Sequence, residues 1–347
     1  MPSKSPHPEE ARRAVSKDGG GMREMPLFHS RPLGPSRITH LMDYLFIVAG
    51  LALLVLGGEG LVRGGVGVAQ RLGLSKAFIG TVLLGFGTSM PEFVATFSAA
   101  ASGADGIAFG NVVGSNVANI LMILGLSALI FPLALPRRGV WRDAAFVMVS
   151  SLGIVLWIWL DGLPRWGGLV LAGAFAVYMV LAFRSSGDEV DETVTFAPLG
   201  RSLLFALGGI AVLVAGAQLL ITGASDVARG LGVSEAVIGI TIVGVGTSLP
   251  EAVSSVIASL KRENELAFAN IIGSNVFNGL AILGVSALAF PLELGGGFGM
   301  VDGIVLLVAT VAMFAFAMTR NVLSRWEGAV FLASYVGYLA WLVSGVV

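Results

Sequence analysis

The sequence predicts an all-α membrane protein whose ten transmembrane helices form two inverted five-helix repeats. Three observations lead to this prediction: a weakly charged composition, ten long apolar segments, and a stretch of sequence that occurs twice. Of the 347 residues, 55% are hydrophobic and 12% are charged, against roughly 25% charged residues in a typical soluble chain. Long, uniformly apolar runs are typical of membrane-spanning helices, and outer-membrane barrels show an alternating pattern instead.

The beginning of the chain differs from the rest. Residues 1–41 are polar, rich in Pro, Gly, Arg and Lys, and free of apolar periodicity, so we expect a disordered N-terminal tail. They hold no apolar core followed by a cleavage site, which argues against a signal peptide. Met42 opens the first apolar run and is a candidate for the natural start of the chain.

Ten apolar segments follow, and each reaches the ~20 residues that a helix needs to cross a bilayer. We place a first repeat of five spans over residues 42–184, a short linker over 185–200, and a second repeat of five spans over 201–347. The approximate spans are 44–70, 76–101, 106–131, 142–160, 166–183, 201–228, 235–260, 265–290, 301–319 and 326–345.

The distribution of basic residues predicts the orientation of the spans. Lys and Arg concentrate in the loops after the odd-numbered spans, whereas the loops after the even-numbered spans hold only Arg165 and Arg229. Because cytoplasmic loops carry the excess of basic residues, we expect the odd-numbered loops and the linker in the cytoplasm. Both termini are then expected outside.

The internal repeat is the strongest signal in the chain. Shifting the sequence by 159 positions aligns residues 87–92 (GTSMPE) with 246–251 (GTSLPE), and 114–119 (GSNVAN) with 273–278 (GSNVFN). Five spans is an odd number, so the second copy enters the membrane from the opposite side. Transporters use such inverted repeats to build a binding site near the midplane. The polar residues are copied along with the scaffold, which favours transport over a purely structural duplication.

Two acidic residues lie near the middle of predicted spans. Glu92 falls in the second span and Glu251 in the seventh, and no Lys or Arg lies at that depth in either repeat. A charge at bilayer depth costs at least about 2.5 kcal/mol, so we expect a bound cation as the partner of the two carboxylates. The alternative is a permanently protonated pair with a structural role.

The chain offers only oxygen ligands within the spans. It has no Cys, and its three His residues all precede the first span. Carboxylate, amide, hydroxyl and carbonyl oxygens suit Na⁺, K⁺, Ca²⁺ and Mg²⁺, and argue against Zn²⁺, Cu⁺ and Fe. One Ca²⁺, with about 6–8 oxygen ligands in flexible geometry, fits better than octahedral Mg²⁺. Two or more Na⁺ ions are the alternative load for the same pair.

The residues around each glutamate fit such a site. Thr88 lies four positions before Glu92, and Thr247 lies four before Glu251, so each pair shares a helix face. A proline directly precedes each glutamate. Because proline lacks an N–H and clashes with the carbonyl four residues back, we expect both helices to break there and to release carbonyl oxygens.

The third and eighth spans contribute further neutral ligands. Ser115 with Asn119, and Ser274 with Asn278, are also four positions apart. For the other amides of these spans, helix–helix hydrogen bonding and ion binding both stay open; they are Asn111, Asn116, Asn270 and Asn275. In the first span, Glu59 and Arg63 predict a local ion pair, with a gate contact as the alternative.

The doubled pattern GTS-x-PE and GSN-xx-N resembles the two alpha repeats of the cation/Ca²⁺ exchanger superfamily, in particular its prokaryotic sodium/calcium exchangers. The resemblance covers residues 42–347. It implies ten helices, an ion-binding core of spans 2, 3, 7 and 8, and sliding of spans 1 and 6 across that core. It implies as ion ligands Glu92, Glu251, Thr88, Thr247, Ser89, Ser248, Ser115, Asn119, Ser274 and Asn278, with backbone oxygens near Gly85 and Gly244.

Two departures from the family pattern matter. Some members carry Asp where this chain has Asn119 or Asn278, which leaves the number of Na⁺ ions and any role of K⁺ open. The spans on either side of the linker are joined by fewer than twenty residues, so we expect no separate Ca²⁺-sensing domain.

Together these features predict a secondary antiporter that exchanges Ca²⁺ for Na⁺ across the cytoplasmic (inner) membrane by alternating access. H⁺/Ca²⁺ or K⁺-dependent antiport on the same scaffold is the near alternative, and a passive cation channel is the alternative from another class. An enzyme is not expected, because no nucleophile or His accompanies the two glutamates. With a net charge of −1, the chain has no basic field for nucleic acid. We expect no cofactor and no obligatory protein partner besides the transported ions and the bilayer.

Overall fold

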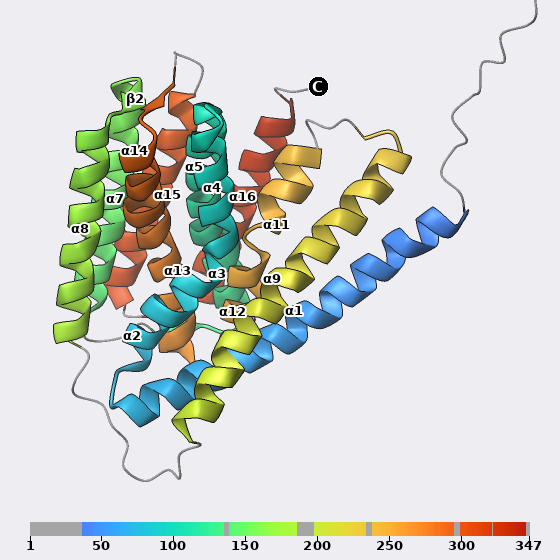
Figure 1. The fold of residues 1–347 in the computed structure, drawn as a ribbon. Coiled ribbons are helices and arrows are strands. Elements are labelled where there is room, and N and C mark those ends of the chain that lie inside the picture. The colour runs from blue at the N-terminus through green and yellow to red at the C-terminus, as the bar shows by residue number, and fades with distance from the viewer. Residues whose placement is uncertain are drawn as a thin grey trace, which may run out of the picture. The chain divides into compact units, whose positions relative to one another are not determined.

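The computed structural model describes residues 37–134, 139–185, 198–233, 238–294, 299–320 and 322–344. Residues from Arg37 onward form one compact unit, and this unit is shown in Figure 1. The first helix begins at Arg37, inside the stretch expected as a tail. The rest of that stretch, and residues 186–197 of the predicted linker, lie outside the described residues.

Each of the ten predicted spans coincides with a helical stretch, and several of these contain π-helical turns, labelled η. The first repeat comprises α1 (Arg37–Leu72), α2 (Lys76–Ile79), η2 (Gly80–Gly85), α3 (Phe86–Thr88), α4 (Met90–Ala101), α5 (Asp105–Val117), η3 (Ala118–Leu124), α6 (Gly125–Ile130), α7 (Val140–Trp159) and α8 (Arg165–Arg184). The second comprises α9 (Leu199–Gly230), η4 (Gly239–Val243), α11 (Gly244–Gly246), α12 (Leu249–Leu260), α13 (Asn264–Val276), η5 (Phe277–Ile282), α14 (Leu283–Ala289), α15 (Met300–Arg320) and α16 (Arg325–Ser344).

The length and hydropathy of these helices are those of a membrane protein. Among the described residues, seven helices are long and apolar enough to cross a bilayer, and a bent pair makes an eighth candidate. The two remaining predicted spans appear as shorter apolar helices, Leu249–Leu260 and Met300–Phe316. The first of these is short because the seventh span is broken, as described below.

Helices α1 and α9 pack against each other along a row of glycines and run antiparallel (Figure 1). A Cβ on Gly50 would lie 2.7 Å from the carbonyl oxygen of Gly216, and one on Gly57 would lie 2.9 Å from that of Gly209. Gly209 and Gly216 are the copies of Gly50 and Gly57 after the shift of 159 positions. Each glycine thus meets the copy of the other, which is the contact expected across a two-fold axis.

Two short β-ladders confirm that the repeats are inverted. Strand β1 (Leu133–Ala134) pairs with β4 (Val322–Leu323), and β2 (Gly162–Leu163) pairs with β3 (Leu292–Glu293). Leu292 of one ladder is the repeat copy of Leu133 of the other, 159 positions further along the chain. The 20-residue helix α7 separates β1 from β2, a distance of about 30 Å. The same sequence element therefore lies at opposite ends of the bundle.

The third and eighth spans form the centre of the bundle. In the most apolar 18-residue stretch of each helix, 72% is buried for Asp105–Ile130 and 83% is buried for Asn264–Ala289. The corresponding share is 22–44% for the other five long helices. Both are rich in small and polar residues. Because these spans are shielded from lipid by other helices, they can carry amides and hydroxyls that a lipid-facing helix could not.

We name the two ends of the bundle by their charge. At the basic end, α1 and α12 finish and α2 and α13 begin, and Arg71, Lys76 and Lys261 lie at or next to these helix ends. At the opposite end lie β2 and β3.

Candidate ion-binding site

The second span breaks directly before its glutamate. Ser89 separates α3 from α4 with φ −82° and ψ 8°, and the two halves of the span are bent by 49°. Pro91 lies in the first turn of α4, where a missing N–H costs no helical hydrogen bond. Glu92 consequently lies in the first turn as well, where the helix dipole favours a negative charge. The predicted break is confirmed.

The seventh span repeats this arrangement. Ser248, with φ −86° and ψ 6°, separates α11 from α12. Pro250 and Glu251 again occupy the first turn of the second half of the span. The two broken spans therefore present two helix N-termini and two carboxylates to the middle of the bundle.

The two carboxylates are buried, and each accepts a hydrogen bond from a serine of the other repeat. Glu92 is 1% exposed and Glu251 is fully buried. Ser89 donates its hydroxyl hydrogen bond to Glu251 Oε1 over 2.8 Å, and Ser248 donates to Glu92 Oε1 over 3.2 Å. Oε2 of each glutamate has no hydrogen-bond partner, and within the described part of the chain neither carboxylate has an ion-pair partner. Two buried carboxylates thus each present one unpartnered oxygen.

The predicted amide ligands are buried without partners. Asn119 is 1% exposed and Asn278 is fully buried, and the side-chain oxygen and nitrogen of both lack any hydrogen bond. They lie in the π-helical turns η3 and η5, a geometry that is frequent at functional sites. An unpaired buried polar group costs about 1–3 kcal/mol, so these amides call for an ion or water as partner.

The predicted serines lie beside the carboxylates. Ser115 and Ser274 are buried at 2% and 0% exposure. Ser115 lies near the carboxylate of Glu92 and Ser274 lies near that of Glu251, and the Ser274 hydroxyl has no hydrogen-bond partner. The structure thus brings the two glutamates together with hydroxyl groups from all four core spans. The role of these groups as ion ligands stays a prediction.

Two amides whose role was open hold the glutamate-bearing helices in place. Asn111 Nδ2 donates to the carbonyl oxygen of Glu92 over 3.1 Å and to Thr96 Oγ1 over 2.8 Å. Its copy Asn270 donates to Ser254 and Ser255 over 3.0 and 2.8 Å. Sequence reasoning missed Thr96 and Ser255. The signal was there, because they are copies of each other and lie four residues after the glutamates.

The other two amides join the two central spans. Asn116 Nδ2 donates to the carbonyl oxygen of Asn275 over 3.3 Å. Asn275 in turn donates to the carbonyl oxygen of Ile271 over 2.8 Å, within its own helix. These contacts correspond to helix–helix hydrogen bonding for Asn116, one of the two readings left open by the sequence.

The two predicted threonines differ in their surroundings. Thr88 is fully buried and donates to the carbonyl oxygen of Leu84 over 2.9 Å. Thr247 is partly exposed. The same difference separates Gly85, which is buried, from Gly244, which is exposed. The repeat symmetry is therefore broken at the turns that precede the two glutamates.

The packing around these two turns differs between the two ends of the bundle. At the basic end, η2 packs against α13, and a Cβ on Gly85 would lie 3.2 Å from the backbone of Gly273. Gly114 is the copy of Gly273, and a Cβ there would meet nothing within 4 Å. Likewise α1 packs against α12, whereas α9 hardly touches α4 in the described part of the chain. As far as the described residues go, the site is closed toward the basic end and open toward the opposite end.

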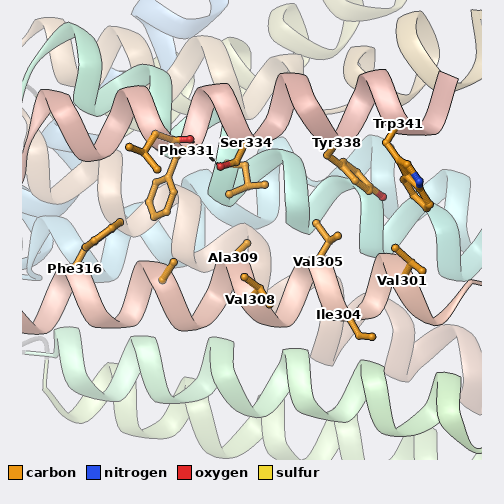
Figure 2. A pocket seen from close by; sticks show the side chains of 13 residues that line it. Val301, Ile304, Val305, Val308, Ala309, Phe316, Phe331, Ser334, Tyr338 and Trp341 are labelled. Carbon is orange, nitrogen blue, oxygen red and sulfur yellow. Dashed lines mark hydrogen bonds between the residues drawn. The ribbon is translucent and has the colours of Figure 1, made fainter. Parts of the chain in front are cut away.

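A separate pocket of about 520 Å³ lies between α15 and α16 (Figure 2). Its lining is almost entirely aliphatic and aromatic, with Val308, Phe331 and Trp341 among the side chains shown, and it contains no carboxylate. Such a surface is a poor match for a hard metal cation, which prefers a shell of oxygen ligands. Among the described residues, no cluster of three or more His, Cys, Asp or Glu offers an alternative metal site.

The family model described as sodium/calcium exchanger protein matches residues 42–184 and 201–344. The chain belongs to the sodium/calcium exchanger family. It is therefore a membrane antiporter of the cation/Ca²⁺ exchanger type and not an enzyme. The two matched segments are the two copies of the repeat.

Several relatives share nearly their whole length with this exchanger. The putative antiporter CaxA of Alkalimonas amylolytica is 33% identical, covering 86% of this chain and 98% of the relative. The sodium/calcium exchanger MaX1 of Methanosarcina acetivorans is 27% identical, with 86% and 97% coverage. The inner membrane protein YrbG of Escherichia coli is 29% identical, with 87% and 96% coverage.

A solved structure shows the same fold. The sodium-calcium exchanger NCX_Mj, soaked with 2.5 mM Na⁺ and 10 mM Sr²⁺, superposes with a TM-score of 0.76 at 30% sequence identity. The match covers 87% of this chain and 99% of the other. The predicted fold class, a helical membrane protein built from two exchanger repeats, is confirmed.

Proposed function

We propose that this exchanger transports Ca²⁺ against Na⁺, and that the carboxylates of Glu92 and Glu251 bind the two ions in turn. The observation that carries the proposal is the buried pair of carboxylates, each with one oxygen that lacks a hydrogen-bond partner. One Ca²⁺ neutralises both negative charges, and so do two Na⁺ ions. Because both loads need the same pair, binding of one excludes the other, and this exclusion is the condition for antiport.

The neutral groups around the pair support Ca²⁺ and Na⁺ as the cargo. Both are hard cations that prefer oxygen ligands. Hydroxyl groups are supplied by Ser115 and Ser274, and amide oxygens by Asn119 and Asn278, all of them buried. The chain has no thiolate, and its imidazoles all precede α1 or lie at its beginning, before the first apolar run, so softer metals have no suitable ligand beside the glutamates.

Relatives of this chain support the same ions. MaX1 is named as a sodium/calcium exchanger, and crystals of NCX_Mj were soaked with Na⁺, Ca²⁺ or Sr²⁺ to study ion exchange. At 27% and 30% identity, the choice of the driving ion can differ between relatives.

The open and closed ends support alternating access. If the two repeats exchange their conformations, η2 leaves α13 and η4 closes on α5, and the site opens toward the basic end. The excess of Lys and Arg supports a cytoplasmic position for the basic end. The described conformation then faces outward. The named location of the relative YrbG supports the inner membrane.

Ion flux into vesicles tests the proposal. The purified chain is reconstituted and ⁴⁵Ca²⁺ uptake is measured with an outward gradient of Na⁺, K⁺ or H⁺, imposed one at a time. We expect uptake with the Na⁺ gradient only. Uptake driven by the pH gradient alone would instead establish H⁺/Ca²⁺ antiport, and a sustained Ca²⁺ conductance without any counter-ion would establish a channel.

Variants of the two glutamates test the site separately from the driving ion. Glu92→Gln and Glu251→Gln each remove one negative charge with little change in shape. We expect each to abolish Ca²⁺ uptake under every gradient while the protein still inserts and folds. Glu293→Gln changes an exposed carboxylate at the opposite end and should leave uptake unchanged.

A further inference from the structure

The basic end contains two ion pairs that connect elements on either side of the closed passage. Glu59 of α1 lies 2.6 Å from the ammonium group of Lys261, at the end of α12, and also pairs with Arg63 one turn along α1. Lys76 of α2 lies 2.7 Å from Glu263, directly before α13. The local pair predicted for Glu59 and Arg63 is confirmed, and Lys261 adds a contact between helices. We call Glu59, Lys261, Lys76 and Glu263 the latch.

The latch connects the elements whose packing closes the site. Closure at the basic end consists of η2 packed on α13 and α1 packed on α12. Lys76 and Glu263 join the first of these contacts, and Glu59 and Lys261 join the second. When the repeats exchange conformations, both contacts must separate, and both ion pairs must break with them.

The opposite end has no copy of the latch. The shift of 159 positions turns Glu59 into Gln218, and it relates Lys261 to Ser102 and Glu263 to Ala104. Lys76 corresponds in the sequence to an acidic residue, Glu235, which lies outside the described residues. Neither pair can therefore re-form at the opposite end after the exchange of conformations.

An inverted repeat has two end states whose packing is related by symmetry, so most of the packing that separates at one end forms again at the other. An interaction without a copy does not form again. We propose that the latch holds this exchanger preferentially in the conformation that is closed at the basic end. The four latch residues bind no transported ion and act by stabilising this conformation. The inference rests on the alternating access proposed above, but it does not depend on which ions are transported.

The latch residues are partly exposed, with side-chain exposures of 22–38%. Exposed ion pairs shift an equilibrium modestly, by about two- to fivefold each. The latch should consequently bias the two conformations without locking the protein in one of them. This is compatible with a transporter that must pass through both states in every cycle.

Cysteine accessibility tests the bias directly, because the chain has no native cysteine. Leu84→Cys places a reporter in the closed passage, where the wild-type residue is fully buried. Val243→Cys places the matching reporter in the open passage, at the copy of Leu84, which is 39% exposed. The rate of labelling by a membrane-impermeant maleimide is measured for each reporter in vesicles accessible from the relevant side.

Breaking the latch should change the two reporters in opposite directions. In Glu59→Gln or Glu263→Gln, we expect the ratio of the labelling rate of the Leu84→Cys reporter to that of the Val243→Cys reporter to rise about two- to fivefold. A general loosening of the protein raises both rates and leaves the ratio unchanged, and that result would overturn the proposal. Labelling needs no transported ion, so a failed Na⁺ flux assay does not affect this outcome.

Two further variants complete the design. The charge swap Lys76→Glu with Glu263→Lys should restore the wild-type ratio, although each single change raises it; failure of the swap would contradict an electrostatic latch. Asp226→Asn breaks an ion pair of 2.7 Å with Arg229 within the single helix α9. It should leave the ratio unchanged, because this pair joins no two moving elements.

Discussion

The position of each carboxylate depends on a serine from the other repeat. Ser89 and Ser248 are the residues at the helix breaks, and each donates across the two-fold axis to the glutamate of the opposite copy. The sequence reveals the buried acids, because Glu92 and Glu251 lie deep in apolar runs. It does not reveal which serine meets which glutamate, because that pairing follows from how two broken helices meet in space.

Removal of one cross-repeat hydrogen bond should weaken ion binding. In Ser89→Ala or Ser248→Ala, a hydrogen bond to a charged acceptor worth about 1.5–3 kcal/mol is removed. We expect the KM for Ca²⁺ in vesicle flux to rise roughly tenfold or more in each variant. By symmetry the two effects should be similar. Ser334→Ala, which removes an exposed hydroxyl bound within α16, is the control, and an unchanged KM in both site variants would count against the assignment.

The unpartnered amides allow stability and function to be separated. Asn278 makes no hydrogen bond to the protein, so Asn278→Leu removes the cost of a buried, unpaired amide. We expect thermal stability in detergent without added ions to stay equal or to increase, while Ca²⁺ uptake is lost. If uptake persists, Asn278 is not part of the ion site. A strong loss of stability would show that the amide has a structural partner.

At the scale of elements, the helix breaks could be predicted and the π-helical turns could not. Pro91 and Pro250 made a break before each glutamate predictable. The turns η3 and η5 have no comparable signature, because a π-helical turn depends on one extra residue fitted between packed neighbours. The stretches that hold Asn119 and Asn278 therefore read as ordinary helix in the sequence.

The glycine row between α1 and α9 gives a prediction with a matched control on the same helix. A side chain at Gly209 would lie 2.4 Å from the backbone nitrogen of Leu61, whereas one at the adjacent Gly208 would meet nothing within 4 Å. Gly209→Val should therefore destabilise the protein by about 1–3 kcal/mol through overpacking. Gly208→Val changes helix propensity in the same way but should not destabilise the protein, because a side chain there meets no neighbour within 4 Å. The midpoint of thermal unfolding in detergent measures both; equal midpoints would contradict the close approach of the two helices.

At the scale of the whole molecule, the architecture was predictable and the conformation was not. Five spans per copy is an odd number, and this alone implies inverted repeats. The sequences of the two copies are alike around the glutamates, so they cannot show which end is closed. That choice appears only in packing, where Leu84 is fully buried and its copy Val243 is 39% exposed. One difference in sequence matches the choice of the closed end: the charged residues of the latch are present at that end only.

Salt should act on the whole molecule through the latch. Partly exposed ion pairs weaken as ionic strength rises, because the Debye length falls from about 10 Å at 0.1 M to about 3 Å at 1 M. We therefore expect labelling of the Leu84→Cys reporter to accelerate in 1 M choline chloride, a salt whose cation is too large for the ion site. The acceleration should be absent when Glu59→Gln and Glu263→Gln are combined. An equal response in both proteins would assign the effect to something other than the latch.

The central claim is that Ca²⁺ and Na⁺ compete for one pair of buried carboxylates, and equilibrium binding to the purified protein tests it most directly. Titration of ⁴⁵Ca²⁺ in a Na⁺-free buffer should show saturable binding that Na⁺ displaces and choline does not. Glu92→Gln and Glu251→Gln should each lose this binding, and Glu293→Gln should retain it. Undiminished Ca²⁺ binding in either site variant, or Ca²⁺ binding that Na⁺ does not displace, would contradict the account.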